Sequence, residues 1–470
     1  MASMKTYLLS AAALPLLSLA APLPVLAQTA PAEVKQLREA ALQDDIAWDI
    51  AEGLTTEVGA RPAGTPEEAR ARDWAVAKLK SLGFKNVHVE DYRMPVWVRG
   101  AETAEVVAPF PQKLFVTALG GSGATPAEGI TAEVVRFETL DALRAAPEGS
   151  LKGKIAFISH EMKRTQDGSG YGYYGGARFV GPSVAATKGA AAVVIRSVGT
   201  DYHRNPHTGQ TNFAEGVSPI PAGALSVPDA ENLARMLERS DNVTLRLVLT
   251  SRTLENQPSG NVVAEVPGSD PKAGIIVIGG HLDSWDLATG AIDNAAGVAI
   301  TAAAAKRIME AGQPRRTIRV VWFGSEETGG FGSDAYFEAH KDENIVLVGE
   351  SDFGAGKVWR VQTGLAEANK DLGDRLARAL APLGVTRGQG KANAGADLSE
   401  FANAGVAAID LNQDGTLYFD YHHTPDDTLD KIDPEELRQN VAAWTTMLSI
   451  TANAPETIER VSEKAPARQP

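Results

Sequence analysis

Residues 274–297 read GIIVIGGHLDSWDLATGAIDNAAG and join an uncharged apolar run to a group of polar side chains. The run at 274–280 is rich in isoleucine and valine, which is typical of a strand buried on both faces of a parallel sheet. His281, Asp283, Asp286 and Asp293 follow where that strand should end. Ligands of open α/β sheets collect at the carboxyl ends of the strands, so this stretch predicts both a fold class and the place of a site.

The alternation of strand and helix continues on the C-terminal side of this stretch. Residues 294–311 have the apolar spacing of a helix, residues 317–324 (TIRVVWFG) read as a strand, and the pattern runs on to a last helix at 433–452. Such alternation is typical of parallel strands covered by helices. The sequence therefore predicts an α/β fold with a mainly parallel central sheet flanked by helices.

The chain of 470 residues is long enough for two domains. Between residues 108 and 254 the pattern changes to short strands and turns, including the Gly/Tyr-rich stretch GSGYGYYGG at 168–176. We therefore expect a smaller, β-rich domain at 108–254, inserted into a discontinuous α/β domain formed by 28–107 and 255–455. The polar residues 456–470 are expected to form a flexible tail.

The first 27 residues have the composition of a signal peptide. Lys5 precedes the apolar stretch YLLSAAALPLLSLA, and small or apolar residues lead up to Gln28. We expect cleavage near Ala27 and export to the periplasm or the extracellular space. No later apolar run is long enough to cross a bilayer, so membrane insertion is not expected.

Charge and cysteine content restrict the kind of site. The formal net charge is −14, which disfavours nucleic acid as a partner. The chain has eight histidines and no cysteine, so a metal site would have to use imidazole and carboxylate ligands. Those ligands without thiolate suit a catalytic zinc site better than a closed structural one.

Polar residues cluster after several predicted strands, and each cluster alone has an ordinary reading as a solvated turn or loop. Together they supply the ligand types that zinc prefers. The clusters contain His281 and Asp283; Glu326 and Glu327; Glu350 and Asp352; and His422, His423 and Asp427.

The motifs HLDSWDLATGAIDNAAG, GSEETGGFGS, ESDFG and HHTPDDT, in this order, resemble the two-zinc (co-catalytic) aminopeptidase family. They are most similar to its carboxypeptidase Q branch, also known as plasma glutamate carboxypeptidase. That branch carries a protease-associated domain before the HxD motif, and GKIAF, KGAAAVVIRS and IPAGALSV resemble parts of such an insert. The resemblance extends over most of the chain after residue 27.

The resemblance implies a ligand set for two zinc ions per chain. His281 and Asp352 would bind one ion, Glu327 and His423 the other, and Asp293 would bridge them. A cis peptide often follows the bridging Asp in this family, here at Asp293–Asn294.

The family also implies roles for three further residues. Glu326 would be the general base and acid for a hydroxide formed from water shared by the two ions. Asp283 would hold the tautomer of His281. His422 stands where many relatives have a Tyr, and it would stabilise the oxyanion.

The implied function is that of an exported zinc-dependent exopeptidase, which hydrolyses short peptides or dipeptides from the N-terminal side. Carboxypeptidase-type action, a one-zinc glutaminyl cyclase-like enzyme and a non-catalytic binding protein of the same fold are the alternatives. The substrate is expected to be a peptide, and a homodimer is compatible with the sequence. Cations available for a substrate carboxylate are Arg178, Arg204 and Lys391.

The remaining polar residues have structural interpretations. Asp286 is interpreted as a loop-capping residue and Asp397 as a residue that orders a turn near the site. The stretch GSGYGYYGG is either a mobile loop or the lining of a substrate cleft. Five histidines have no assigned role: His88, His160, His203, His207 and His340.

Overall fold

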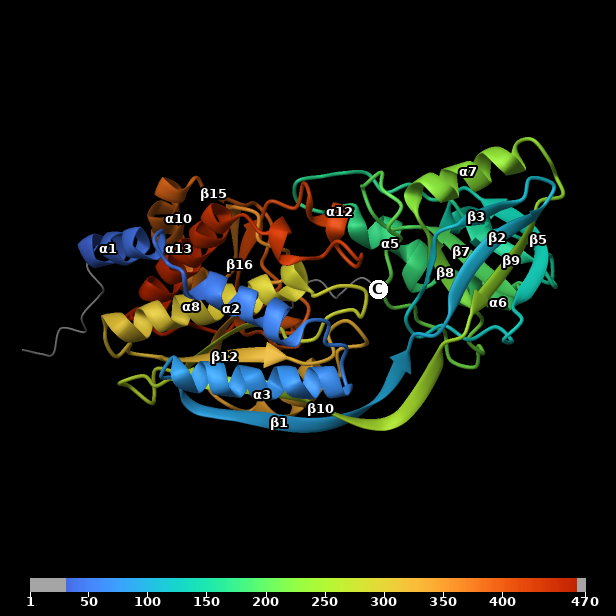
Figure 1. The fold of residues 1–470 in the computed structure, drawn as a ribbon. Helices are drawn as coiled ribbons and strands as arrows, with labels where there is room; N and C mark the ends of the chain where they lie inside the picture. The colour runs from blue at the N-terminus through green and yellow to red at the C-terminus, as the bar shows by residue number, and fades with distance from the viewer. Residues whose placement is uncertain (1–30, 463–470) are drawn as a thin grey trace, which may run out of the picture.

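Two eight-stranded sheets organise the protein, and the computed structural model describes residues 31–462 of it (Figure 1). The predicted signal peptide, residues 1–27, lies outside the described residues. The architecture is mixed α/β, as the sequence predicts. Helices pack against each sheet, and the two sheets lie at opposite ends of the molecule in Figure 1.

The first sheet is parallel at its centre and antiparallel on both sides of that centre. Strands β12, β11, β13 and β16 run parallel. Strands β1 and β10 pair antiparallel with their neighbours, and β14 pairs antiparallel with β16 but parallel with the edge strand β15. The predicted mainly parallel sheet is therefore a mixed one. The order is β1 (Lys85–Val98), β10 (Arg252–Val266), β12 (Thr317–Phe323), β11 (Ile275–His281), β13 (Ile345–Glu350), β16 (Ala407–Gln413), β14 (Val358–Gly364) and β15 (Thr386–Arg387).

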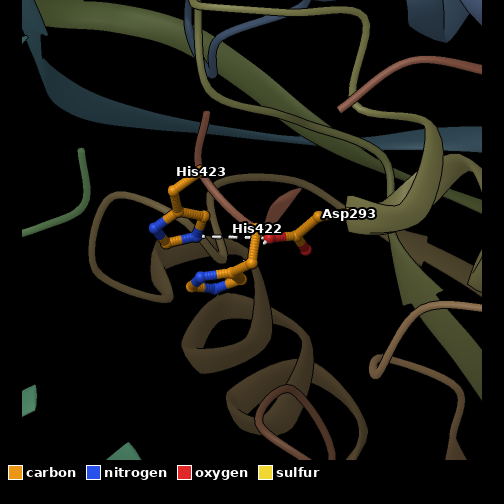
Figure 2. A group of neighbouring side chains, drawn as sticks. All are labelled: Asp293, His422 and His423. Carbon is orange, nitrogen blue, oxygen red and sulfur yellow. Dashed lines mark ion pairs between the residues drawn. The ribbon is translucent and has the colours of Figure 1, made fainter. Parts of the chain in front are cut away.

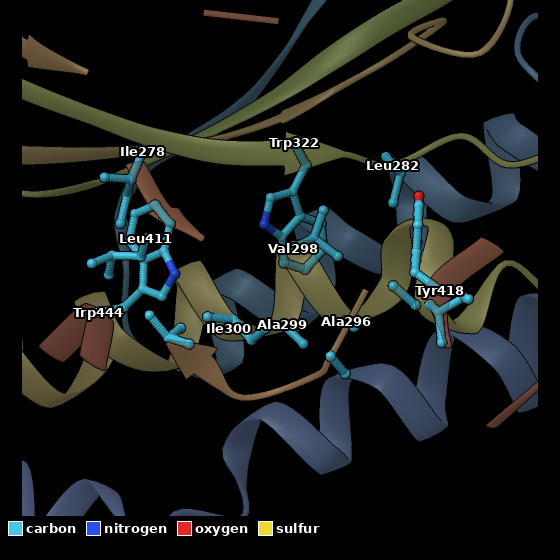
Figure 3. Close-up of a cluster of buried hydrophobic side chains, with 14 of the residues drawn as sticks. Ile278, Leu282, Ala296, Val298, Ala299, Ile300, Trp322, Leu411, Tyr418 and Trp444 are labelled. Atoms are coloured by element: carbon cyan, nitrogen blue, oxygen red, sulfur yellow. The ribbon is translucent and has the colours of Figure 1, made fainter. Parts of the chain in front are cut away.

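Successive residues of the central strands pack on opposite faces of this sheet. Ile276 and Ile278 belong to the larger core, whereas Val277 belongs to a second core on the other face. Trp322 and Trp444 lie in the larger core beside the start of α8 (Figure 3). Both faces are thus apolar, which explains the nearly continuous hydrophobic runs in the sequence.

Helices cover both faces of the first sheet. Within residues 31–462 no helix combines the length and the hydropathy that crossing a bilayer requires. The larger core includes α1 (Pro31–Ala41), α2 (Ile46–Gly53), α3 (Pro66–Ser81), α8 (Ala296–Ala311), α10 (Lys370–Leu380) and α13 (Pro434–Thr451), and the smaller one includes α9 (Phe331–His340) and α11 (Ser399–Asn403).

The second sheet is built from β2 to β9 and starts at Glu102, before the predicted boundary at residue 108. This unit is α/β rather than simply β-rich, because helices α4 (Leu140–Arg144), α5 (Tyr171–Phe179), α6 (Gly181–Thr187) and α7 (Val227–Leu237) accompany it. Its order is β3 (Gln112–Leu114), β2 (Glu102–Ala108), β9 (Thr244–Leu249), β5 (Ile130–Phe137), β6 (Ile155–Ile158), β7 (Ala192–Arg196), β8 (Ala222–Leu225) and β4 (Val116–Ala118).

A two-stranded ribbon connects the two sheets. Strands β1 and β10 pair antiparallel as far as Val98 and Arg252, and β2 and β9 resume the pairing at Glu102 and Leu249. Between them the amide of Thr250 donates to the carbonyl of Ala101 at 3.0 Å. The chain therefore enters and leaves the second unit along adjacent strands (Figure 1). We call residues 98–102 and 249–252 the connecting ribbon.

Residues 456–461, which composition assigns to a flexible tail, are instead held against the first sheet domain. Ile458 is buried, and the amide of Val461 donates to the carbonyl of Gly405 at 2.8 Å. The guanidinium of Arg316, fully buried at the start of β12, donates to the carbonyl of Glu456 at 2.6 Å. Composition missed this packing because the contacts are made to backbone carbonyls of distant segments.

We predict that Arg316→Met lowers the free energy of unfolding by about 3 kcal/mol or more, because it leaves buried carbonyls without donors. For a domain of this size the melting temperature should fall by roughly 6 °C or more in thermal denaturation. Arg144→Met is the control, since this exposed arginine forms a surface ion pair with Asp141. Equal melting temperatures for the two variants would contradict the prediction. The carbonyls that Arg316 satisfies are those of Ala273, Thr451, Ala454 and Glu456.

Candidate metal centre

The carboxyl ends of three adjacent parallel strands gather the predicted site residues. His281 ends β11, Glu326 and Glu327 follow β12, and Asp352 follows β13. Ser325 has a positive φ of 63°, so the chain turns sharply just before the glutamate pair. Parallel strands place these carboxyl ends at one edge of the sheet, which is why residues far apart in the sequence meet here.

His281 faces two carboxylates. Its Nε2 lies 3.1 Å from Oδ1 of Asp293 and 3.2 Å from Oδ1 of Asp352. Its Nδ1 lies 2.9 Å from the backbone carbonyl of Asp283 and farther, 3.6 Å, from the carboxylate of that residue. The carboxylate of Asp283 accepts instead from the amides of Glu326 and Glu327, at 3.2 and 3.4 Å. Asp283 thus holds both the imidazole of His281 and the turn at Glu326–Glu327.

His423 faces a second pair of carboxylates. Its Nε2 lies 2.9 Å from Oε2 of Glu327 and 3.2 Å from Oδ2 of Asp293 (Figure 2). Asp293 therefore turns one oxygen to His281 and the other to His423, and a cis peptide bond follows it at Asp293–Asn294. This arrangement places the Asp293 carboxylate between two separate groups of donors.

His422 lies beside this second group. Its ring stacks on that of His423 with centroids 3.5 Å apart, and its Nε2 lies 3.5 Å from Oδ2 of Asp293. Figure 2 shows both imidazoles on the same side of Asp293. His422 is therefore close enough to contact a metal ion or a reacting group at this position.

The donor atoms fit a metal site. Three groups of His, Asp and Glu side chains each offer ligand atoms within 4.8 Å of one another. Among residues 31–462, no well-aligned hydrogen-bond donor faces the buried oxygens Asp293 Oδ2, Glu327 Oε1 and Asp352 Oδ1, although imidazoles lie 3.2 Å from the first and the last. Buried carboxylate oxygens without donors are costly, and a divalent cation would satisfy them. Imidazole and carboxylate donors are a set that zinc prefers. The groups are Asp293, His422 and His423; His281, Asp293 and Glu327; and His281, Glu326 and Asp352.

Without a metal ion, several carboxylates lie close together at this edge of the first sheet and repel one another. Burial and the neighbouring carboxylate of Asp352 raise the pKa of Glu326 well above its usual value. Burial also raises the pKa of Glu327 to about 6. Although burial acts in the opposite direction on His423, the carboxylates of Glu327 and Asp293 raise its pKa to about 9. Positive charge at the site, from protons or metal ions, therefore stabilises it.

A cavity of about 590 Å³ opens over the donor atoms. Its lining includes Asp293, Glu326, Asp352 and His422, and also Asp397, whose two carboxylate oxygens are buried without hydrogen-bond partners. The amide of Asp397 donates to Glu350 at 2.8 Å, so the residue does order a turn there, as its sequence context suggests. Its carboxylate nevertheless faces the cavity, which the sequence did not indicate.

The second sheet unit forms the opposite wall of this cavity. Tyr171, Arg178 and Gln210 line it, and Tyr171 stacks on Phe419 of α12 (Tyr418–Tyr421) with ring centroids 4.8 Å apart. The stretch GSGYGYYGG therefore leads into helix α5 and lines the cavity. Of the two interpretations from the sequence, the structure favours the lining of a cleft over a mobile loop. Arg204, one of the other available cations, is paired with Asp229.

A loop of the second unit also holds the segment that carries His423. His207 is buried, with Nδ1 2.7 Å from the carbonyl of His422 and Nε2 2.6 Å from Asp201. The amide of Thr208 donates to the carbonyl of His423 at 3.0 Å. We call His207 and Thr208 the clamp. The sequence could not reveal it, because nothing in the local pattern shows which loops meet.

Two aspartates near the site have supporting contacts. Asp286 forms a two-point ion pair with Arg99 at 2.8 and 2.9 Å. Asp427 accepts from the amide of Ile292 at 2.7 Å, next to Asp293. Both residues thus hold loops that surround the donor atoms.

The sequence and the fold match known peptidases. The model of peptidase family M28 matches residues 261–448, a span that contains all the predicted ligands. Carboxypeptidase Q from Bos taurus is 33% identical over 411 residues, which cover 87% of this chain and 85% of the relative. The chain belongs to peptidase family M28. It is accordingly a hydrolase of the metallo-exopeptidase class.

Solved structures agree with this membership. The M28 peptidase precursor from Shewanella amazonensis is 46% identical, with a TM-score of 0.90 over 92% of this chain and 99% of that protein. A zinc aminopeptidase from Bacillus subtilis, BSAP, shares the fold at 19% identity, with a TM-score of 0.64 over 90% of this M28 chain and 98% of that protein.

We predict that Asp397→Asn stabilises the chelator-treated M28 chain at pH 8 and has little effect at pH 4. Burial and the carboxylates of Asp352 and Asp283 raise the pKa of Asp397 from 3.8 to about 7. The folded state therefore binds an extra proton between these values, and its stability falls as pH rises from about 4 to 7. Thermal denaturation at both pH values measures the difference. Equal effects at the two pH values would contradict the assignment.

Proposed function

We propose that this M28 peptidase is a zinc-dependent exopeptidase that removes residues from the N-terminal side of short peptides, dipeptides included. The observation that carries the proposal is the shared cavity, in which both donor groups, Glu326 and the unpaired carboxylate of Asp397 meet. An unpaired, buried carboxylate suits the free ammonium group of a peptide N-terminus.

We assign two zinc ions to the donor atoms. His281 and Asp352 would hold one, Glu327 and His423 the other, and Asp293 would share its two oxygens between them. When bound, such ions supply Lewis-acid polarisation of a carbonyl and a lowered pKa of coordinated water. The two-sided placement of Asp293 supports two positions rather than one.

Glu326 is the residue proposed to move the proton. Its side chain lies with His281 and Asp352 at the cavity wall, and a partly buried carboxylate beside another carboxylate holds a proton readily. It would take a proton from the attacking water and give it to the leaving amine. His422, whose Nδ1 is buried without a partner, would contact the oxyanion through its other nitrogen.

The second sheet unit is proposed to be a protease-associated domain, and the chain to be exported by its N-terminal segment. The position of the unit between β1 and β10, ahead of His281, supports the first assignment. The charged and apolar pattern of residues 1–27 supports the second.

Removal of metal should abolish peptide hydrolysis, and zinc should restore it. We expect the chelated full-length chain to lose at least about 100-fold in activity on a free dipeptide, because water activation depends on the metal. Activity should saturate near two zinc ions per chain in a titration followed by elemental analysis. Full activity at one ion per chain, or activity without metal, would contradict the two-zinc assignment.

Glu326→Gln should keep both the fold and the bound zinc while kcat falls roughly 10²–10⁴-fold, the range for loss of a general base. Metal content, circular dichroism and steady-state kinetics are measured together. Glu338→Gln, on the exposed side of α9, is the matched control and should leave kcat unchanged. A Glu326→Gln enzyme with near-normal turnover would remove Glu326 from this role.

A further inference from the structure

Three arginines are among the largest fully buried side chains: Arg61, Arg178 and Arg316. Arg61 and Arg316 each direct their guanidinium to four backbone carbonyls, which is how a buried arginine is normally satisfied. Arg178 differs from both, because within the described part of the chain only one carbonyl, that of Thr208 at 3.3 Å, accepts from it.

The other contacts of Arg178 leave its charge uncompensated. Its Nη2 donates to the hydroxyl of Tyr171, and its Nε is buried without an acceptor. The guanidinium lies 4.5 Å from the ring centre of Phe179 and 5.3 Å from that of Tyr171. Among residues 31–462 it forms no ion pair with an Asp or Glu side chain. A buried cation of this kind is costly unless an anion joins it.

The remaining contact, with His423, would be lost when that imidazole serves as a ligand. Nη1 of Arg178 lies 3.4 Å from Nδ1 of His423, and Nδ1 lies 3.3 Å from the carbonyl of Thr208. If Nε2 faces a metal ion, Nδ1 carries the proton and can donate only to the carbonyl. Nη1 then has no acceptor on the imidazole, so its N–H group can donate to a ligand in the cavity that Arg178 lines.

Arg178 lies close to the donor atoms, on the other side of the His423 ring. One imidazole ring separates its Nη1 from the carboxylates around Nε2 of His423. In a peptide, the carboxylate one residue beyond a scissile carbonyl is about 3.3–3.6 Å farther along the chain. A leaving group of one residue would therefore extend its free carboxylate from the donor atoms toward the guanidinium, which can donate hydrogen bonds to it.

We infer that Arg178, contributed by the second sheet unit, binds the carboxylate of the residue directly after the scissile bond, with the hydroxyl of Tyr171 as a second donor. Tyr171 accepts from Arg178, and among the described residues no acceptor is shown for its own proton. This inference rests on the proposed exopeptidase function and names the residue that would recognise the free carboxylate of its substrates. Asp397 would face the ammonium end and Arg178 the carboxylate end of the same cavity.

A cycle of two substrates and two enzymes tests the inference. The zinc-loaded full-length chain and its Arg178→Gln variant are assayed on L-alanyl-L-alanine and on its C-terminal amide. The wild type should prefer the free carboxylate by at least about 100-fold in kcat/KM, since a site built for a charged group rejects the analogue that lacks it. In Arg178→Gln, kcat/KM should fall on the dipeptide and stay unchanged on the amide, so that the ratio of the two values falls to near one. Arg204→Gln is the matched control and should keep the wild-type ratio, because Arg204 pairs with Asp229 away from the cavity lining.

The outcomes separate this inference from the proposed function. Equal losses on both substrates, with the ratio unchanged, would overturn the carboxylate role and leave a purely structural arginine. A wild type that cleaves the amide as well as the dipeptide would also overturn it, while the exopeptidase function would stand. Absence of cleavage of either substrate would instead overturn the proposed function. If Arg178→Gln does not fold, the Tyr171→Phe variant replaces it. Its ratio of kcat/KM on the dipeptide to kcat/KM on the amide should fall roughly 3–10-fold, as expected for one lost hydrogen bond. An unchanged ratio would overturn the inference.

Discussion

The structure depends on one buried carboxylate that serves two imidazoles. Asp293 presents Oδ1 to His281 and Oδ2 to His423. A further carboxylate contacts each histidine, that of Asp352 at His281 and that of Glu327 at His423. So many acidic groups in a low-dielectric region repel one another, and only positive charge between them makes the arrangement favourable. The strand ends and the turn at Glu326–Glu327 position groups around this carboxylate. Binding of metal and the order of this edge of the sheet are therefore linked.

The candidate centre is assembled from both sheet units. The first domain supplies the donor atoms, but the clamp from the second unit holds the backbone of His422 and His423. Tyr171 and Arg178 close the cavity from the same side. A small shift of the second unit would thus change both the geometry of one histidine and the size of the cavity. The second unit therefore contributes to the geometry of the donor atoms as well as to the lining of the cavity.

Sequence patterns predicted the α/β fold and the grouping of side chains at the strand ends. Both follow from local rules: buried strands such as 274–280 have a distinctive composition, and polar residues that follow parallel strands must meet at one edge. The antiparallel strands of the first sheet and the packed segment 456–461 depend on long-range pairing, which local composition does not encode. Arg178 and His207 lie in loops and helices of the insert, and only the docking of that unit brings them to the centre.

The connecting ribbon has a consequence for how this architecture can be divided. Because entry and exit run along neighbouring strands, the ends at Val98 and Arg252 face each other as paired residues, and a short turn could join them as a hairpin. The first domain would then be a topologically complete fold with its donor atoms intact. It would lack the clamp and one wall of the cavity, so the segment that carries His422 and His423 would lose the hydrogen bonds that fix its backbone, and the donor atoms would open to solvent.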